Sequence, residues 1–110
     1  MDKKTYTVEF YGMNFEIKLF TGNYTNGRPA IVAETVDGEP FCDLTVNLPE
    51  TCIPDEGYAF IDTNNAPFAL NLIVENNLGE FTEINGTSGW CRYPLVKLHL
   101  DELTKAATQF

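Results

Sequence analysis

The segment Asp62-Thr63-Asn64-Asn65-Ala66-Pro67 separates two different hydrophobic patterns in this chain of 110 residues. Residues 57–62 form a short aromatic and β-branched run that begins with a glycine, which is typical of a strand. The residues after the segment are mostly apolar up to Gly79, which suits the left-handed conformation that commonly follows a last helical turn. Asparagine is a favourable N-cap, and proline is tolerated in the first turn. We therefore expect a strand at 57–62 and then a helix at about 66–77.

The oxygen-bearing side chains of this segment also resemble those of a calcium loop. The EF-hand pattern fails at three positions, because Ala66 stands where a ligand is needed, Pro67 replaces the glycine and Ile73 replaces the terminal glutamate. Helix capping explains the asparagines and the proline without a ligand. The segment is therefore expected to start a helix and to bind no cation.

A β-hairpin is expected at residues 4–20. Apolar residues alternate on both sides of Gly12-Met13, which suits a type II′ turn with glycine at its first central position. That turn would set Phe10 opposite Phe15 on the apolar face and Glu9 opposite Glu16 on the other face.

Four further strand patterns complete the expected sheet. Residues 29–36 and 41–48 form a second hairpin, and 80–86 and 89–100 form two closing strands. Both hairpins have an apolar face and a face that carries carboxylates, as in an antiparallel sheet that is covered on one side. We therefore predict an α+β fold: an antiparallel sheet of five to seven strands with one helix, at about 66–77, packed on one face.

Length and composition predict one globular domain over 1–110. The hydrophobic fraction of 44% argues against disorder, and residues 101–110 are expected to be either one helical turn capped by Asp101 or a frayed tail. No window approaches the length of a membrane span, and Met1 leads into a strand rather than a signal segment. Three cysteines without close pairing fit a reducing compartment, so the expected location is cytoplasmic.

The formal net charge is −9, and it is distributed unevenly. The 63 residues between Arg28 and Arg92 contain eleven acidic residues and no lysine or arginine. Direct binding of nucleic acid requires cations that neutralise phosphates, so this excess argues against a nucleic-acid ligand. Two interpretations stay open: the acids serve only solubility, or they form a face that attracts a basic partner surface.

Three blocks of the sequence resemble a known family: Leu44-Thr45-Val46-Asn47-Leu48-Pro49, Asp62-Thr63-Asn64-Asn65-Ala66-Pro67 and Ser88-Gly89-Trp90-Cys91-Arg92-Tyr93-Pro94. Over about residues 5–100 the chain resembles a domain-of-unknown-function family of small acidic proteins, carried on conjugative and other mobile elements of gut bacteria. The resemblance implies no catalytic residue. It implies a genetic context in which small accessory proteins often counter host defence.

Residue types that support metal binding or catalysis occur without a recognisable arrangement. A Cys3His set is present in Cys42, Cys52, Cys91 and His99, but structural zinc sites use closely spaced pairs such as Cys-x2-Cys. A catalytic thiol would need a neighbouring cation or a helix N-terminus, which the spacing does not indicate. We therefore expect no metal, no cofactor and no enzymatic activity.

The expected function is recognition of another protein. We predict a non-enzymatic anti-defence inhibitor, of the anti-CRISPR or anti-restriction type, whose carboxylate face competes for a basic nucleic-acid-binding surface of a host protein. The residues expected to contact this partner are Glu34, Asp37, Glu39, Asp43, Asp55, Glu56, Trp90 and Arg92. Tryptophan and arginine are enriched at interface hot spots, and the alternative for Trp90 is burial in the core together with Tyr93.

Two other functions fit the same sequence. A small ligand-binding accessory protein or enzyme would use 49–57 and 90–93 as the walls of a deep pocket. A homodimer that serves only assembly would expose an unpaired strand edge or an apolar patch. The chain is expected to be a monomer or a homodimer, with no membrane partner.

Overall fold

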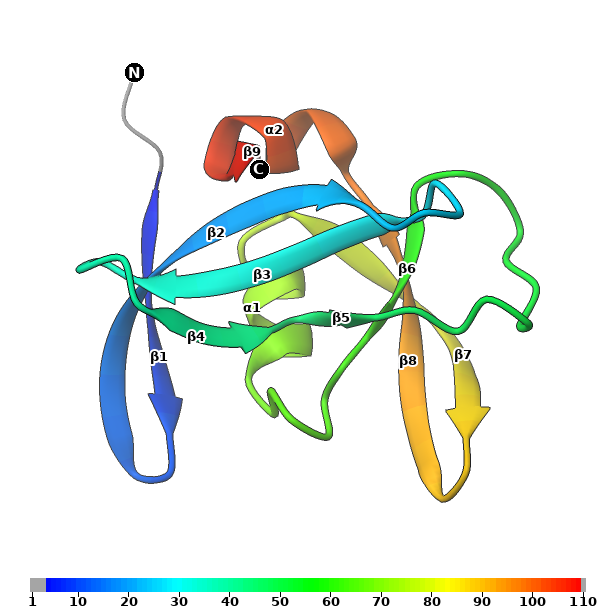
Figure 1. Cartoon of the computed structure of the whole chain (residues 1–110), viewed down its shortest axis with the longest axis horizontal. Coiled ribbons are helices and arrows are strands. Elements are labelled where there is room, and N and C mark those ends of the chain that lie inside the picture. The colour runs from blue at the N-terminus through cyan, green and yellow to red at the C-terminus, as the bar shows by residue number, and fades with distance from the viewer. Residues whose placement is uncertain (1–3, 110) are drawn as a thin grey trace.

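The computed structural model describes residues 4–109, and two β-sheets organise them (Figure 1). Sheet A has the order β1-β2-β3-β4, and β9 pairs in parallel with β2. Its strands are β1 (Thr5–Phe10), β2 (Met13–Asn23), β3 (Pro29–Thr35), β4 (Pro40–Asp43) and β9 (Thr108–Gln109). Sheet B has the order β5-β6-β8-β7. Its strands are β5 (Thr45–Val46), β6 (Tyr58–Ile61), β7 (Gly79–Ser88) and β8 (Cys91–Leu98).

Two short helices complete the described part of the chain. They are α1 (Ala69–Glu75) and α2 (Leu100–Ala106), each of seven residues. The expected α+β fold, with one sheet and one long packed helix, is therefore wrong: the molecule is nearly all β, with sheets of five and four strands. The expected number of five to seven strands fell short for two reasons. The strand predicted at 41–48 is divided between the two sheets as β4 and β5, and β9 lies in the segment that was expected to be one helical turn or a frayed tail.

The chain passes from sheet A to sheet B at Leu44, in the middle of the strand expected at 41–48. The amide of Leu44 donates to the carbonyl of Ile31 in β3 at 2.9 Å, and its carbonyl accepts from the amide of Asp62 after β6 at 2.8 Å. The buried hydroxyl of Thr45 accepts a further hydrogen bond from the amide of Ile31 at 3.1 Å. A two-residue period shows which side of a strand is buried, but not which sheet the strand joins.

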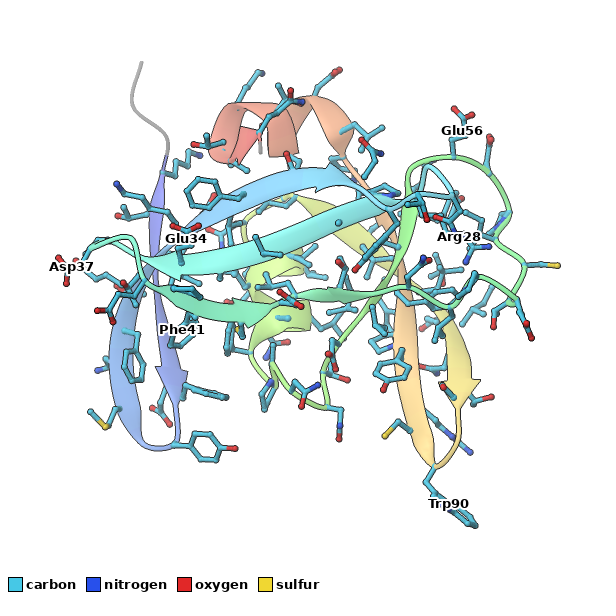
Figure 2. The ribbon with its side chains drawn as sticks, in the orientation of Figure 1. Arg28, Glu34, Asp37, Phe41, Glu56 and Trp90 are labelled. Carbon is cyan, nitrogen blue, oxygen red and sulfur yellow. The ribbon has the colours of Figure 1, made fainter. Side chains whose placement is uncertain are left out.

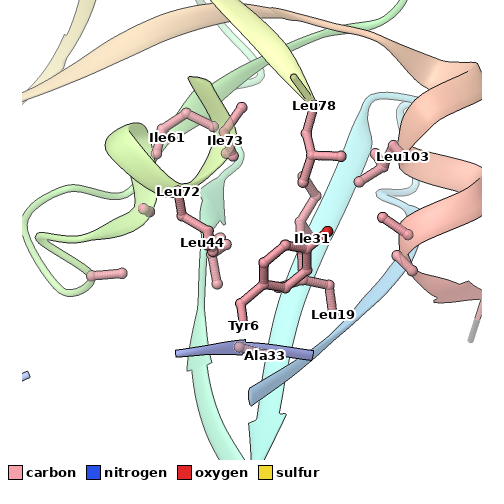
Figure 3. Packing of buried hydrophobic residues seen from close by; sticks show 14 of the residues in the cluster. Tyr6, Leu19, Ile31, Ala33, Leu44, Ile61, Leu72, Ile73, Leu78 and Leu103 are labelled. Atoms are coloured by element: carbon pink, nitrogen blue, oxygen red, sulfur yellow. The ribbon is translucent and has the colours of Figure 1, made fainter. Parts of the chain in front are cut away.

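The main hydrophobic core lies between the two sheets and both helices (Figure 3). Its members include Tyr6, Leu19, Ile31, Leu44, Ile61, Leu72, Ile73, Leu78 and Leu103. A smaller cluster of Leu48, Phe60 and Leu95 lies on the opposite face of sheet B, since neighbours along a strand point to opposite faces. Sheet B is thus covered on both faces over part of its length.

The helix α1 is shorter than the expected 66–77, and asparagine does not cap it. Its N-cap is Phe68, which makes no side-chain capping hydrogen bond. The buried carboxylate of Asp62 instead holds the preceding turn, because it accepts the backbone amide of Asn65 at 3.1 Å and the side-chain amide of Asn65 at 3.0 Å. The helix ends before Asn77, which has a φ of 59°.

The β1–β2 hairpin has a different turn from the one expected. Its central residues are Tyr11 and Gly12, with φ of 52° and 75°, and positive φ at both positions is the mark of a type I′ turn. The expected Gly12-Met13 turn is therefore wrong, and Val8 rather than Phe10 lies opposite Phe15. Glu9 faces Asn14 instead of Glu16. The register moves by two residues, so every side chain keeps its expected face.

Four phenylalanines pack together at the edge of the core, beside the turn of the β1–β2 hairpin. The rings of Phe10 and Phe15 contact Phe41, with centroid distances of 5.6 and 5.0 Å, and Phe41 contacts Phe68 at 6.0 Å. All four rings are half-buried. We call these four residues the phenylalanine cluster.

Candidate interaction surface

The outer face of sheet A carries carboxylates from three neighbouring strands. Ile17 in β2 is buried, so its neighbours Glu16 and Lys18 face outward. The register sets Lys18 opposite Glu34 in β3, and the exposed Asp43 extends the same face onto β4. Neighbouring strands lie about 4.8 Å apart, so these carboxylates form one compact group.

The β3–β4 turn adds two more carboxylates, Asp37 and Glu39, both exposed. The turn is well fixed, because the amide of Thr35 donates to the carbonyl of Glu39 at 2.8 Å and the amide of Glu39 donates to the hydroxyl of Thr35 at 3.1 Å. Gly38 has a φ of 91°, which an L side chain rarely adopts. We call Glu16, Glu34, Asp37, Glu39 and Asp43 the acidic face.

No ion pair neutralises the acidic face within residues 4–109. The two ion pairs of this part of the chain lie elsewhere and join His99 to Glu80 at 3.3 Å and Lys105 to Glu102 at 3.5 Å. Lys18 lies among the carboxylates without forming an ion pair to any of them. The face therefore presents a net negative potential to solvent, which Lys18 offsets only in part.

Of the remaining two expected acids, Glu56 lies at the opposite end of the molecule from Asp37 (Figure 2), and Asp55 precedes it in the chain. They belong to a loop that Arg28 holds, since its guanidinium donates to the carbonyls of Leu48 and Thr51, each at 2.7 Å. The structure thus brings four of the six expected acids together and separates Asp55 and Glu56 from them.

Trp90 lies at the tip of the β7–β8 hairpin and is fully exposed, at 103% (Figure 2). The alternative that it packs in the core is wrong. Gly89 and Trp90 are the two central turn residues, and Gly89 has a φ of 60°, as the first position of a type II′ turn requires. Arg92 pairs with Thr87 in the same hairpin and is also exposed. These two residues are distant from the acidic face.

The expected pocket between 49–57 and 90–93 does not form as one site in the described part of the chain. An open pocket of about 410 Å³ has residues 26–29 and 53–57 as its walls. A second, of about 350 Å³, lies between 47–51 and the pair Thr87 and Ser88. Neither is lined by Trp90, which points away into solvent.

Cys42 and His99 are among the titratable side chains of the described residues whose pKa is raised by their surroundings. Burial raises the pKa of the Cys42 thiol to about 11, and the carboxylates of Asp43 and Asp62 add to the shift, so this thiol stays protonated. The imidazole of His99 uses both nitrogens, with Nδ1 at 2.9 Å from the carbonyl oxygen of Asn77 and Nε2 at 3.3 Å from Glu80. Within residues 4–109 no group of three or more His, Cys, Asp and Glu side chains is arranged to hold a metal ion.

Sequence reasoning left two features out of the expected site. Glu16 belongs to the acidic face, and the signal for it was the outward position of this residue in the first hairpin pattern. Tyr11 and Met13 are large exposed side chains, at 89% and 61%, in and beside the β1–β2 turn. The exposure of Tyr11 was not expected, because a turn at Gly12-Met13 would have placed this residue in a strand.

No helix of the described residues is both long and apolar enough to cross a membrane.

Comparison with other proteins identifies the family of this chain but not its function. Neither the curated proteins nor the solved structures contain a match to this chain. A family model, described as a domain of unknown function (DUF4313), matches residues 18–109. Since this match covers most of the 110 residues, the chain belongs to the DUF4313 family.

Proposed function

We propose that this protein is a non-enzymatic inhibitor that binds a basic, nucleic-acid-binding surface of another protein through its acidic face. The single observation that carries the proposal is the acidic face itself: five carboxylates from β2, β3, β4 and the β3–β4 turn, without an ion pair in residues 4–109. Strand pairing and the hydrogen-bonded turn fix the backbone that carries these side chains. Binding therefore costs little ordering of the backbone.

The charge of the face indicates the chemistry of the partner. A surface that binds nucleic acid concentrates lysine and arginine, and opposite charges accelerate association and fix orientation. Nucleic acid itself would be repelled by a chain with a net charge of −9. A protein that has evolved to bind phosphates is thus the partner class that fits this face best.

The finer part of the proposal concerns the biological setting. The resemblance to small acidic proteins of conjugative elements in gut bacteria favours a host defence protein as the partner, such as a restriction or CRISPR effector in the cytoplasm. Trp90 and Arg92 would supply a second contact on a partner large enough to reach the β7–β8 tip. No catalytic step, metal or cofactor is part of this mechanism, because occupation of the basic surface is sufficient for inhibition.

The test compares two variants that carry the same charge. Reversal of Glu34, Asp37, Glu39 and Asp43 to lysine removes the acidic face and changes the net charge from −9 to −1, because each of four reversals adds two positive charges. The matched control reverses four exposed acids elsewhere, Glu50, Asp55, Glu56 and Glu83, with the same change of charge.

Wild-type protein and both variants are used to capture partners from lysates of bacteria with active restriction and CRISPR systems. Any captured effector is then purified and assayed for DNA binding by gel shift. We expect wild type and the control to inhibit DNA binding, with inhibition that weakens as salt rises, and the face variant to lose at least about 100-fold in potency. An equal loss of potency in both variants would show that net charge alone causes inhibition. Undiminished inhibition by the face variant would show that the acidic face does not bind the effector.

A further inference from the structure

A groove runs between β1, at the edge of sheet A, and the helix α1. Within the described chain β1 pairs only with β2, so its other edge presents backbone N–H and C=O groups that no strand uses. The groove has a volume of about 380 Å³ and lies along this free edge. An open strand edge beside a helix is a geometry in which an extended peptide can add as a further strand.

The two walls of the groove have matching lengths. Residues Thr5–Glu9 line the strand side and span roughly 13 Å at about 3.3 Å per residue. The helix side consists of Phe68, Asn71, Leu72, Glu75 and Asn76, whose spacing of three, four, seven and eight residues defines one helical stripe. This stripe spans roughly 12 Å at 1.5 Å per residue. The groove therefore accommodates about four residues of extended chain.

The chemistry of the groove selects a basic segment with an apolar residue. The half-buried Phe68 and the small exposed edge of the otherwise buried Leu72 give the helix side a short apolar strip, and Glu75 lies at one end of it. Phe68 packs on Phe10, with ring centroids 5.8 Å apart, so this end of the helix lies beside the end of β1 that carries Glu9. One carboxylate therefore lies near each end of the groove. No lysine or arginine of the described residues lines it, and the exposed Lys4 precedes it.

We propose that this groove binds an extended basic segment of a partner protein, which pairs with β1 as an additional strand. An apolar side chain of the segment would pack on Phe68 and Leu72. A lysine or arginine on the helix side would reach Glu75. A second basic side chain on the outer side would reach Glu9, which faces outward because its neighbour Val8 is buried. A second copy of the chain is disfavoured as the occupant, because two chains of net charge −9 repel each other.

Glu75 lies on α1, outside the acidic face, whereas Glu9 is a diagonal neighbour of Glu16 on the outer face of sheet A, so the two sites adjoin at β1. The probes are two fluorescein-labelled peptides, Ser-Lys-Thr-Ile-Lys-Ser and the reversed sequence, which cover parallel and antiparallel pairing. Fluorescence anisotropy measures binding, and amide chemical shifts locate it. We expect one of the two to bind, with shifts concentrated in β1 and α1. Methylation of alternate backbone nitrogens of that peptide, which blocks strand pairing and keeps the side chains, should weaken binding at least about tenfold.

The variant Glu9→Lys/Glu75→Lys should weaken binding by about tenfold or more, whereas Glu50→Lys/Glu83→Lys, with the same change of charge, should not. Both pairs are exposed, so thermal unfolding should be unchanged. Three outcomes would each overturn the site: binding by neither peptide, equal binding of the N-methylated peptide, or equal loss in both variants. Self-association through β1 in sedimentation experiments would show that a second copy occupies the groove, and would also overturn it. All of these readouts are independent of any effector captured by the acidic face.

Discussion

The two long hairpins project to the same side of the molecule, but they are supported in different ways (Figure 1). At the β1–β2 tip the ring of Tyr11 lies 4.4 Å from Phe10, which continues into the phenylalanine cluster and the main core. At the β7–β8 tip no aromatic ring of the described residues packs on Trp90. The first hairpin thus contributes to the core along its length, and the second extends beyond it.

This difference separates stability from recognition. Aromatic residues that pack on one another stabilise a fold. A fully exposed tryptophan gains no stability from burial, and its ring is accessible to a partner. The β7–β8 hairpin is anchored instead three residue pairs away from its turn, where Gly86 lies against Phe60. Mutations in the two hairpins should therefore have unequal effects on stability, and the inequality can be measured.

The largest effect is expected at the base of the first hairpin. Ile17 is completely buried between β1 and β3, and Ile17→Ala removes its side chain from the main core. We expect a loss of about 3–4 kcal/mol in the free energy of unfolding, measured by urea denaturation with circular dichroism. The control Asn14→Ala, at an exposed position of the same strand, should change stability by less than about 0.5 kcal/mol. A loss below about 1 kcal/mol for Ile17→Ala would contradict the assignment of this hairpin to the core.

A smaller loss is expected at Gly86 in the second hairpin. A Cβ atom at Gly86 would lie 2.6 Å from a ring carbon of Phe60 and 3.0 Å from a methyl group of Leu48. The φ of Gly86 is not positive, so the strain of Gly86→Ala is steric and not conformational. We expect a loss of about 2 kcal/mol, in the range of overpacked cores.

The neighbouring exposed Asn85 provides the control for this substitution. Asn85→Ala adds no atom near Phe60 and should be close to neutral. An unchanged melting temperature for Gly86→Ala would mean that β7 can move away from Phe60 at little cost, and that the second hairpin is held less firmly at this contact than the packing indicates.

The strands themselves could be predicted because alternation is a local property. The buried faces of β1, β2 and β3 follow the two-residue period that the sequence displays. The division into two sheets could not be predicted, because it depends on the hydrogen bonds of Leu44 to Ile31 and Asp62, which are distant in sequence. Local pattern carries no information on such pairings.

The turns were harder to predict than the strands. Glycine occupies the second central position in Tyr11-Gly12 and the first in Gly89-Trp90, so a glycine alone does not fix the register. The candidate site shows the same limit. Glu34, Asp37, Glu39 and Asp43 come together because they share one hairpin, whereas the position of Asp55 and Glu56 depends on the tertiary hydrogen bonds of Arg28.

Aromatic truncation in the phenylalanine cluster and at the β7–β8 tip should give unequal results. Phe41→Ala removes the central ring of the phenylalanine cluster and should cost about 1–2 kcal/mol, less than a fully buried ring because Phe41 is half-exposed. Trp90→Ala should lie within about 0.5 kcal/mol of wild type. Trp90 is the only tryptophan, so its fluorescence should change little on unfolding, and a large change would show that the ring is shielded in solution.

The smallest effect is a pH dependence at the base of the second hairpin. The carbonyl of Asn77 raises the pKa of His99 above its ordinary value of about 6.5, and the Glu80 carboxylate raises it further. Because this pKa is raised in the folded state, protonated His99 stabilises the fold. This stabilisation is complete at a pH below the ordinary pKa of histidine and is lost as the pH rises through the pKa of His99 in the folded protein. The change should be slight, because the pair is exposed to solvent and surface ion pairs contribute little.

A titration of the imidazole followed by NMR measures the pKa of His99 directly. In Glu80→Gln it should fall yet stay above its ordinary value, since the hydrogen bond to the Asn77 carbonyl, the largest single cause of the rise, remains; a fall to the ordinary value would assign the whole shift to Glu80.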